Sequence, residues 1–149
     1  MDWLEPLRGD VVGLDTSVFI YFIQRHPDYM GVVRPFFAAL DRHELDAVTS
    51  VVSLIEVLVQ PLRHGDQRLA SEYRDILLHA DGLTTLPVTS STAEMAARLR
   101  AEWGIRTPDA IQMATALQGG ATHFLTNDHR LPRTTGLSLL ILDELRPVQ

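Results

Sequence analysis

The sequence predicts an α/β fold in which a mostly parallel sheet carries helices on both faces. Short apolar runs typical of buried strands alternate with segments whose hydrophobic residues recur at helical spacing. Strands that alternate with helices are joined by crossovers, which make neighbouring strands parallel. A length of 149 residues suits one domain, and no repeat, linker or low-complexity tract divides the chain. We therefore expect one domain over residues 1–149, with residues 1–10 as an extension before the first strand.

The first half of the chain is expected to hold two strands and four helices. Val11-Val12-Gly13-Leu14 is a short apolar run, and the polar residues directly after it can open a helix. The helix after the second strand has apolar residues on nearly every side, which predicts that it is buried nearly all round. The expected elements are strand 11–14, a helix that opens at 15–17 and runs to 23, helix 31–43, strand 45–49, helix 50–62 and helix 67–79.

Capping residues and glycines divide the second half in the same way. Gly104 ends one expected helix and Gly119-Gly120 ends the next. Thr107 followed by Pro108 is a typical helix start. The expected elements are strand 83–88, which Pro87 weakens, a helix capped by Ser90 or Ser91 that runs to Trp103, a helix from Thr107 to Gln118, strand 123–126 with a turn at 127–128, and strand 137–142.

The chain has no cysteine and no lysine, since all 13 basic residues are arginine. The lack of cysteine excludes disulfides, thiolate metal sites and a cysteine nucleophile. The lack of lysine excludes a P-loop, a Schiff base and a lysine general base. The 6 histidines show no zinc-binding spacing, and Ser17, Ser50 and Ser53 lack the context of a serine hydrolase nucleophile. The chemistry is therefore expected to come from carboxylates.

A net charge of −6 is unusual for a protein that binds nucleic acid. Two Mg²⁺ ions would change the net charge from −6 to −2, and arginines would remain to contact phosphates. The acidity therefore does not exclude a nuclease. No apolar run approaches the roughly 20 residues of a membrane span, and the N-terminal residues are acidic and interrupted by Pro6. We expect a cytoplasmic protein with no membrane contact.

Four carboxylates stand where an expected strand ends or an expected helix begins. They are Asp15, Glu56, Asp109 and Asp128. Such positions meet at one edge of a parallel sheet, where open α/β sheets bind ligands. Because clustered carboxylates repel one another, a divalent cation is expected to offset their charge. The placement predicts a metal-dependent site for phosphate chemistry.

Each of the four also has a purely structural interpretation. Asp15 can cap the helix after it, and Ser53 to Glu56 matches a capping box. Asp109 lies in the first turn of a helix, where the helix dipole favours negative charge, and Asp128 suits a turn. Independent caps have no reason to gather, however, whereas a site for a hard cation requires it.

Four segments form an ordered set of motifs that spans most of the chain. They are Leu14-Asp15-Thr16-Ser17-Val18, Ser53-Leu54-Ile55-Glu56-Val57, the stretch from Arg106-Thr107-Pro108-Asp109 to Ala114-Thr115-Ala116-Leu117, and Phe124-Leu125-Thr126-Asn127-Asp128. In order and spacing these motifs resemble the PIN-domain ribonucleases, in particular the VapC-type toxins. The resemblance extends from Val11 to Leu145, and the third segment is its most specific part. It implies a three-layer α/β/α sandwich.

The resemblance also implies an endoribonuclease that depends on Mg²⁺ or Mn²⁺. The implied catalytic and metal-binding residues are Asp15, Glu56, Asp109 and Asp128. The implied supporting residues, which would position phosphate or water, are Thr16, Thr126 and Asn127. The resemblance further implies a homodimer and, for the toxin branch, inhibition by a cognate antitoxin that often inserts an arginine among the carboxylates.

We predict that one or two bound cations lower the pKa of a water and direct it at an RNA phosphodiester. Arg106, Arg130 and Arg133 are expected to hold the RNA, unless they are ordinary surface residues. A module that binds RNA or protein without cutting, or a housekeeping RNA-processing nuclease, is the alternative. An aspartyl-phosphate at Asp15 is disfavoured, because residue 17 is serine and no lysine could hold the phosphate.

Overall fold

The computed structural model describes residues 2–133 and 136–147, so Met1 of the expected extension lies outside them. Within these ranges five strands form one parallel sheet in the order β3-β2-β1-β4-β5. The strands are β1 (Val11–Leu14), β2 (Asp46–Ser50), β3 (Leu83–Leu86), β4 (His123–Thr126) and β5 (Ser138–Ile141). The expected α/β fold is confirmed, and every strand pair is parallel.

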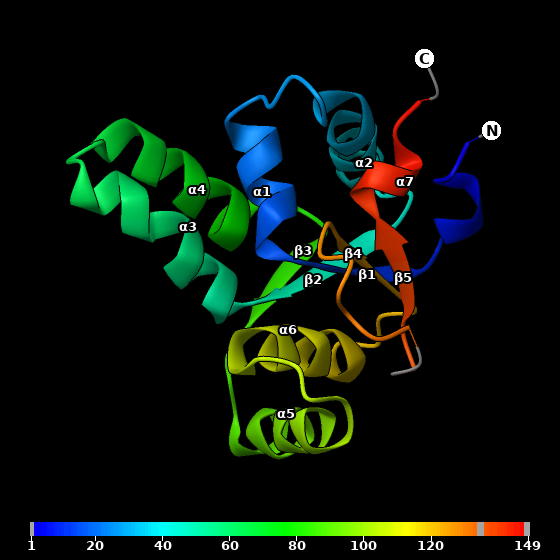
Figure 1. Cartoon of the computed structure of the whole chain (residues 1–149). Coiled ribbons are helices and arrows are strands. Elements are labelled where there is room, and N and C mark those ends of the chain that lie inside the picture. The colour runs from blue at the N-terminus through cyan, green and yellow to red at the C-terminus, as the bar shows by residue number, and fades with distance from the viewer. Residues whose placement is uncertain (1, 134–135, 148–149) are drawn as a thin grey trace.

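Helices cover both faces of the sheet and make a three-layer sandwich (Figure 1). The helices α5 and α6 lie on one face, α1 and α2 lie on the other, and α3 and α4 form a paired arm to one side. The helices are α1 (Thr16–Ile23), α2 (Met30–Asp41), α3 (Val51–Arg63), α4 (Gln67–His79), α5 (Ser90–Trp103), α6 (Thr107–Gln118) and α7 (Leu142–Leu145), and a 3-10 turn, η1, covers Glu5–Leu7.

The two faces of the sheet bury separate hydrophobic clusters, and β1 contributes to both by alternation. Its Val12 and Leu14 belong to the cluster under α1, α2 and α4. Gly13 points at the other face, where a Cβ would lie 2.5 Å from Cβ of Ala116 and 2.9 Å from Cδ1 of Phe124. The sequence therefore needs glycine at residue 13, because α6 packs directly on the backbone of β1.

The expected elements are present, with corrections at some of their ends. Thr89 rather than Ser90 or Ser91 caps α5, because it forms a reciprocal capping box with Thr92. The expected last strand is shorter than predicted, because Leu142 already begins α7. Neither α7 nor η1 was predicted, since a helix of one turn is too short to show a period. In the extension, Trp3 stacks on a core phenylalanine of α2.

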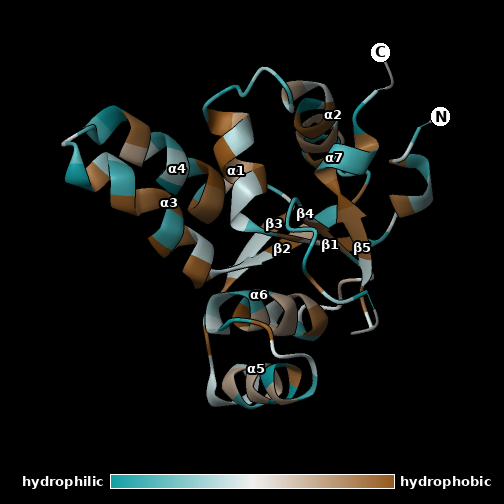
Figure 2. Ribbon diagram, in the orientation of Figure 1, coloured by the Kyte–Doolittle hydropathy of each residue, from teal (hydrophilic) through white to brown (hydrophobic). Residues whose placement is uncertain are grey.

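The expectation that the helix after β2 is buried nearly all round is wrong. On α3, Ile55 is 62% exposed and Leu62 is 59% exposed. The reason is that α3 and α4 pack on each other as an arm and extend past the sheet, which leaves Ile55 and Leu62 on the outer face of α3 exposed. Figure 2 shows that the end of this arm, where α3 leads into α4, is hydrophilic.

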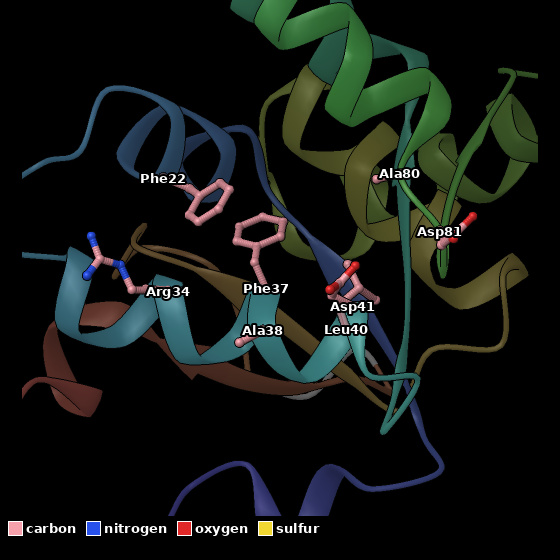
Figure 3. Close-up of a pocket in the computed structure, with 8 residues that line it drawn as sticks. All are labelled: Phe22, Arg34, Phe37, Ala38, Leu40, Asp41, Ala80 and Asp81. Atoms are coloured by element: carbon pink, nitrogen blue, oxygen red, sulfur yellow. The ribbon is translucent and has the colours of Figure 1, made fainter.

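No helix in the described ranges is long and apolar enough to cross a membrane. One surface pocket, of about 380 Å³, lies between the end of α1, α2 and the segment after α4 (Figure 3). The aromatic rings of Phe22 and Phe37 stack at 4.2 Å in its wall, with Arg34 and Asp81 at its rim. None of the four candidate carboxylates lines it, so this pocket is not the candidate active site.

Candidate active site

The four predicted carboxylates stand at the carboxyl edge of the sheet, where the strand order changes direction. Asp15 follows β1 and Asp128 follows β4, and these two strands pair although they are not consecutive. Glu56 lies on α3, which begins where β2 ends, and Asp109 lies in the first turn of α6. The edge where such an order reverses is the usual ligand crevice of a parallel α/β sheet.

Asp15 is partly buried, and both of its oxygens accept a hydrogen bond. Oδ1 accepts from the backbone N–H of Thr16 at 2.8 Å, so Asp15 also caps α1. Oδ2 accepts from Oγ1 of Thr126 at 2.6 Å. Burial raises the pKa of Asp15 to about 6, the two hydrogen bonds oppose this rise, and the charges of Asp109 and Glu56 add to it. The capping interpretation of Asp15 is therefore confirmed, and its role as a metal ligand stays a prediction.

Glu56 is held by a hydroxyl rather than by a capping box. Oγ1 of Thr16 donates to Oε1 of Glu56 at 2.6 Å. The cap of α3 is Ser50, which accepts from the backbone of Val52 at 3.1 Å. The capping-box interpretation of Ser53 and Glu56 is wrong, because β2 ends at Ser50 and Ser53 already lies inside the helix.

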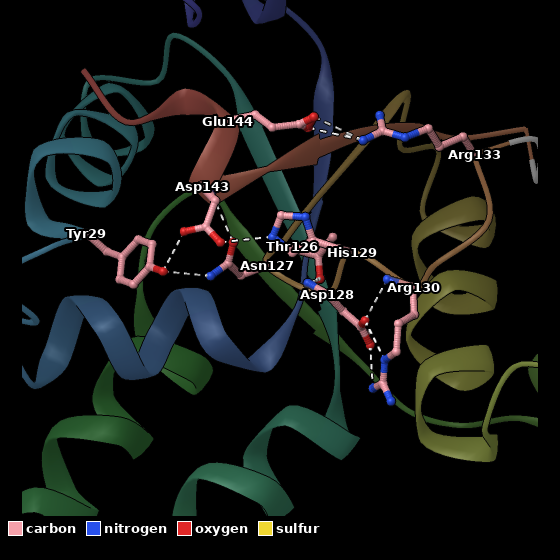
Figure 4. Close-up of polar contacts among 9 residues, drawn as sticks. All are labelled: Tyr29, Thr126, Asn127, Asp128, His129, Arg130, Arg133, Asp143 and Glu144. Atoms are coloured by element: carbon pink, nitrogen blue, oxygen red, sulfur yellow. Dashed lines mark hydrogen bonds and ion pairs between the residues drawn. The ribbon is translucent and has the colours of Figure 1, made fainter. Parts of the chain in front are cut away.

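Asp109 and Asp128 each pair with a nearby arginine. Nε of Arg106 lies 3.3 Å from Oδ2 of Asp109. Arg130 forms a bidentate ion pair with Asp128, with Nε and a terminal nitrogen each 3.0 Å from a carboxylate oxygen (Figure 4). This pair holds the pKa of Asp128 below its usual range. Both pairs line one cavity of about 190 Å³ beside Trp103 and the neighbouring residues.

The third predicted arginine lies elsewhere. Arg133 pairs with Glu144 of α7 at 3.1 Å and does not line the cavity beside Asp109 and Asp128. The structure thus places two of the three arginines next to candidate carboxylates. That these arginines hold RNA stays a prediction.

Asn127 faces the opposite side of its turn, towards α7. Its Nδ2 donates to the hydroxyl of Tyr29 at 3.0 Å, and its Oδ1 accepts from the backbone of Asp143 at 3.0 Å. The hydroxyl of Tyr29 donates in turn to Asp143 at 2.6 Å (Figure 4). These bonds fix the turn that carries Asp128. The predicted role of Asn127 at phosphate or water stays a prediction, since its amide bonds Tyr29 and Asp143 here.

Sequence reasoning missed a buried polar network beneath Glu56. Gln112 donates from Nε2 to Oγ of Ser53 at 2.7 Å and to Oγ1 of Thr16 at 3.3 Å. Ser53 also lies 2.9 Å from Oγ1 of Thr49, which donates to the carbonyl of Leu14. Gln112 follows Asp109 by one helical turn, and that spacing on α6 is the signal that could have identified it.

The residues fit a divalent cation by their chemistry. Among residues 2–133 and 136–147, no three Asp, Glu or His side chains lie close enough to hold an ion as they stand. Two of the four carboxylates are bonded to arginines, and Glu56 to a hydroxyl. The donor set is nevertheless all carboxylate, which hard cations prefer. The raised pKa of the partly buried Asp15 is in keeping with a carboxylate whose charge a cation would stabilise.

Solved structures share this fold. The most similar include VapBC2 from Rickettsia felis, in a complex bound to a promoter DNA fragment, with 20% identity over 88% of this chain and 98% of that chain and a TM-score of 0.69. A toxin-antitoxin complex from Klebsiella pneumoniae has 19% identity over 89% of this chain and 97% of that chain, with a TM-score of 0.63. VapC20 from Mycobacterium tuberculosis, a toxin that cleaves the sarcin-ricin loop, has 20% identity over 76% of this chain and 86% of that chain, with a TM-score of 0.61.

No curated protein sequence matches the chain. A family model does, and it is the model of the PIN domain. The match covers residues 12–137, from strand β1 to the residue before strand β5, and includes all four candidate carboxylates. This range is most of the chain. The protein therefore belongs to the PIN domain family.

Proposed function

We propose that this chain is a divalent-metal-dependent endoribonuclease and the toxin of a toxin–antitoxin pair. The observation that carries the proposal is the placement of four acidic residues at the carboxyl edge of β1 and β4, around the partly buried Asp15. Carboxylate oxygens in this setting suit Mg²⁺ or Mn²⁺, and such ions are the usual catalysts of phosphodiester hydrolysis. The PIN domain match and the fold shared with VapC toxins support the same conclusion.

In this proposal, Asp15, Glu56 and Asp109 hold the cation and Asp128 is a fourth acidic ligand. When bound, a divalent cation supplies an activated water and stabilises the negative charge of the reacting phosphate. The hydroxyls of Thr16 and Thr126 orient the carboxylates of Glu56 and Asp15, as their hydrogen bonds of 2.6 Å indicate. Hydrolysis by water leaves a 5′-phosphate and a 3′-hydroxyl at each cut.

Arg106 and Arg130 have a separate task in the proposed reaction. They lie beside Asp109 and Asp128 at the mouth of the site, with most of each side chain exposed. If the carboxylates of Asp109 and Asp128 held a cation, these guanidinium groups would be free to bind RNA phosphates, which they match in geometry. In this proposal the two arginines pair with the carboxylates in the metal-free protein and bind phosphates in the RNA complex.

For partners, we propose a cognate antitoxin and a second copy of the chain. The similar structures from Rickettsia felis and Klebsiella pneumoniae are toxin–antitoxin complexes. The exposed apolar face of α3, with Ile55 and Leu62, supports burial against a partner, because such residues are uncommon together on a free surface. Light scattering on the purified chain tests the dimer, for which the expected mass is twice that of the chain.

A module that binds RNA without cutting it is the second candidate. The observation that favours it is that Asp109 and Asp128 already have arginine partners. An activity assay separates the two candidates. In the nuclease, the arginines leave the carboxylates when cation is added and RNA is cut, whereas in the binding module RNA binds and stays intact.

The test is cleavage of total RNA by purified chain with Mg²⁺ or Mn²⁺. We expect discrete fragments that disappear with EDTA and with Asp109→Asn. The matched control is Asp46→Asn, since Asp46 is an exposed acid at the opposite end of β2 and should not affect cleavage. Mapping of the ends adds a second check, because a 2′,3′-cyclic phosphate product would contradict attack by water. Intact RNA with either cation would contradict the nuclease proposal.

A further inference from the structure

Gln112 is a buried amide whose two N–H donors are both in use. Its side chain is 3% exposed, and Nε2 donates to Ser53 at 2.7 Å and to Thr16 at 3.3 Å. Its Oε1 accepts no hydrogen bond from any residue that the structure describes. Burying an unpaired carbonyl is unfavourable, and an apolar side chain of the same size would avoid it. The donors are therefore what this position requires.

The direction of the first branch follows from the partners' chemistry. Oγ1 of Thr49 donates to the carbonyl of Leu14 at 2.9 Å, because a carbonyl can only accept. Thr49 therefore accepts from Ser53, 2.9 Å away, which uses the single proton of the Ser53 hydroxyl. Ser53 in turn must accept from Gln112. This branch needs an N–H donor on Gln112.

The second branch leads to a candidate metal ligand. Thr16 directs its hydroxyl proton to Oε1 of Glu56 at 2.6 Å and so can only accept from Gln112. A flipped amide would present its oxygen to two hydroxyls whose protons are already committed. The amide orientation is thus fixed, and both branches run outward from Gln112, one to the end of β1 and one to Glu56.

We propose that Gln112 is a positioning residue that orients the carboxylate of Glu56 for a divalent cation by holding the hydroxyl of Thr16. The inference rests on the proposed function, since it concerns a ligand of that site. Hydrogen bonds in such a chain strengthen one another. Oγ1 of Thr16 also lies 3.2 Å from Oγ of Ser53, and its shorter bond, of 2.6 Å, goes to Glu56. Losing a partner that orients a metal ligand typically weakens metal binding by roughly 10- to 100-fold.

The test measures Mn²⁺ binding to the full chain by calorimetry, for the unmodified protein and for Gln112→Met. This replacement keeps the length of the side chain and removes its donors. We expect the Kd for Mn²⁺ to rise by about tenfold. Gln112→Leu is a second apolar replacement, and thermal unfolding in EDTA identifies the variants that fold.

The matched control is Thr115→Val on the same helix. Thr115 is 1% exposed, its hydroxyl has no hydrogen-bond partner in the described part of the chain, and it is not part of the network. Removing this buried hydroxyl should leave the Kd for Mn²⁺ unchanged. A folded Gln112 variant with an unchanged Kd overturns the proposal, and so does a Thr115→Val variant that weakens Mn²⁺ binding as much as Gln112→Met does.

A double-variant cycle tests the route through Thr16. Because Gln112 acts on Glu56 by way of the Thr16 hydroxyl, Gln112→Met should weaken Mn²⁺ binding little further in a Thr16→Val background. Thr16→Ser keeps a hydroxyl and should restore the dependence on Gln112. If Gln112→Met weakened Mn²⁺ binding tenfold both in the unmodified protein and in Thr16→Val, Gln112 would not act on Glu56 through Thr16.

Binding and cleavage separate this proposal from the proposed function. If the Kd for Mn²⁺ shifts as expected but the unmodified chain cuts no RNA, the nuclease proposal fails and the role of Gln112 stands. If RNA is cut in a metal-dependent way while the Kd is insensitive to Gln112, the reverse holds. If the unmodified chain does not bind Mn²⁺, both are overturned.

Discussion

The hydroxyl of Thr126 donates a hydrogen bond of 2.6 Å to Oδ2 of Asp15 and so joins the end of β4 to the end of β1. The same hydroxyl accepts from the backbone N–H of Asp128 at 3.1 Å. One side chain thus connects two candidate metal ligands that lie more than a hundred residues apart in the sequence. The charge on Asp15 is stabilised by this bond, which opposes the effect of burial on its pKa.

Thr126→Val should therefore raise the pKa of Asp15 above its value of about 6. Protons compete with the cation for this carboxylate, so the midpoint of the pH dependence of Mn²⁺ binding should move to higher pH. The variant should also lose about 1 kcal/mol of stability at pH 7, because the partly buried carboxylate of Asp15 loses a donor. Calorimetric titration between pH 5 and pH 8, roughly the range around that pKa, gives the midpoint. Thr126→Ser keeps the hydroxyl and should behave like the unmodified protein.

Asp15 should make the metal-free protein less stable as the pH rises towards 6. Its folded-state pKa is about 6 and its ordinary value is 3.8, so between these values the folded state holds a proton that the unfolded state lacks. Stability therefore falls as pH rises through this window, by up to about 3 kcal/mol. In EDTA, Asp15→Asn should be more stable than the unmodified protein at pH 7 and similar to it near pH 4. Urea unfolding at both pH values measures the free energy of unfolding of the two proteins. An equal difference between them at both pH values would contradict the raised pKa of Asp15.

Arg130→Gln should have opposite effects on the cation and on RNA. Removing the arginine lets the pKa of Asp128 return upward and frees its carboxylate, so Mn²⁺ should bind more tightly. RNA should bind more weakly, and the slope of log affinity against log salt should become smaller by about one unit. Filter binding in Mn²⁺ with a non-hydrolysable RNA analogue measures the second effect. Arg42→Gln is the control, because Arg42 pairs with Glu44 on the surface and lines no part of the cavity beside Asp128.

Gly13→Ala should destabilise the protein, because the new Cβ would lie 2.5 Å from Cβ of Ala116 and push α6 away from β1. Such overpacking costs about 1–3 kcal/mol. Gly31→Ala is the matched control in α2, where a Cβ meets no atom within 4 Å. Alanine there should be neutral or should stabilise the helix by about 0.5–1 kcal/mol. Urea unfolding of both variants checks the pair, and equal midpoints would show that α6 can adjust at no cost.

The sequence predicted the order of the elements and the edge at which the carboxylates gather. Those features depend on local signals, such as the apolar run of β1 and the glycine after α5, and on the rule that parallel strands end together. It did not predict that Gln112 bonds Thr16, 96 positions away, or that Tyr29 bonds Asp143, 114 positions away. Such contacts depend on how the helices pack on the sheet. The exposure of Ile55 was missed for the same reason, because composition does not show where an arm leaves the body.

The arginine pairs of Asp109 and Asp128 also bear on how the protein is made. A small metal-binding domain whose ligands have no other partners stays unfolded until its ion arrives. Here two of the acids have charged partners within the chain itself, at 3.3 Å and 3.0 Å. A newly synthesised copy should therefore fold without waiting for a cation. Under the proposed function it would meet its partner chain first, and its activity would begin later, once the carboxylates hold an ion in place of the arginines.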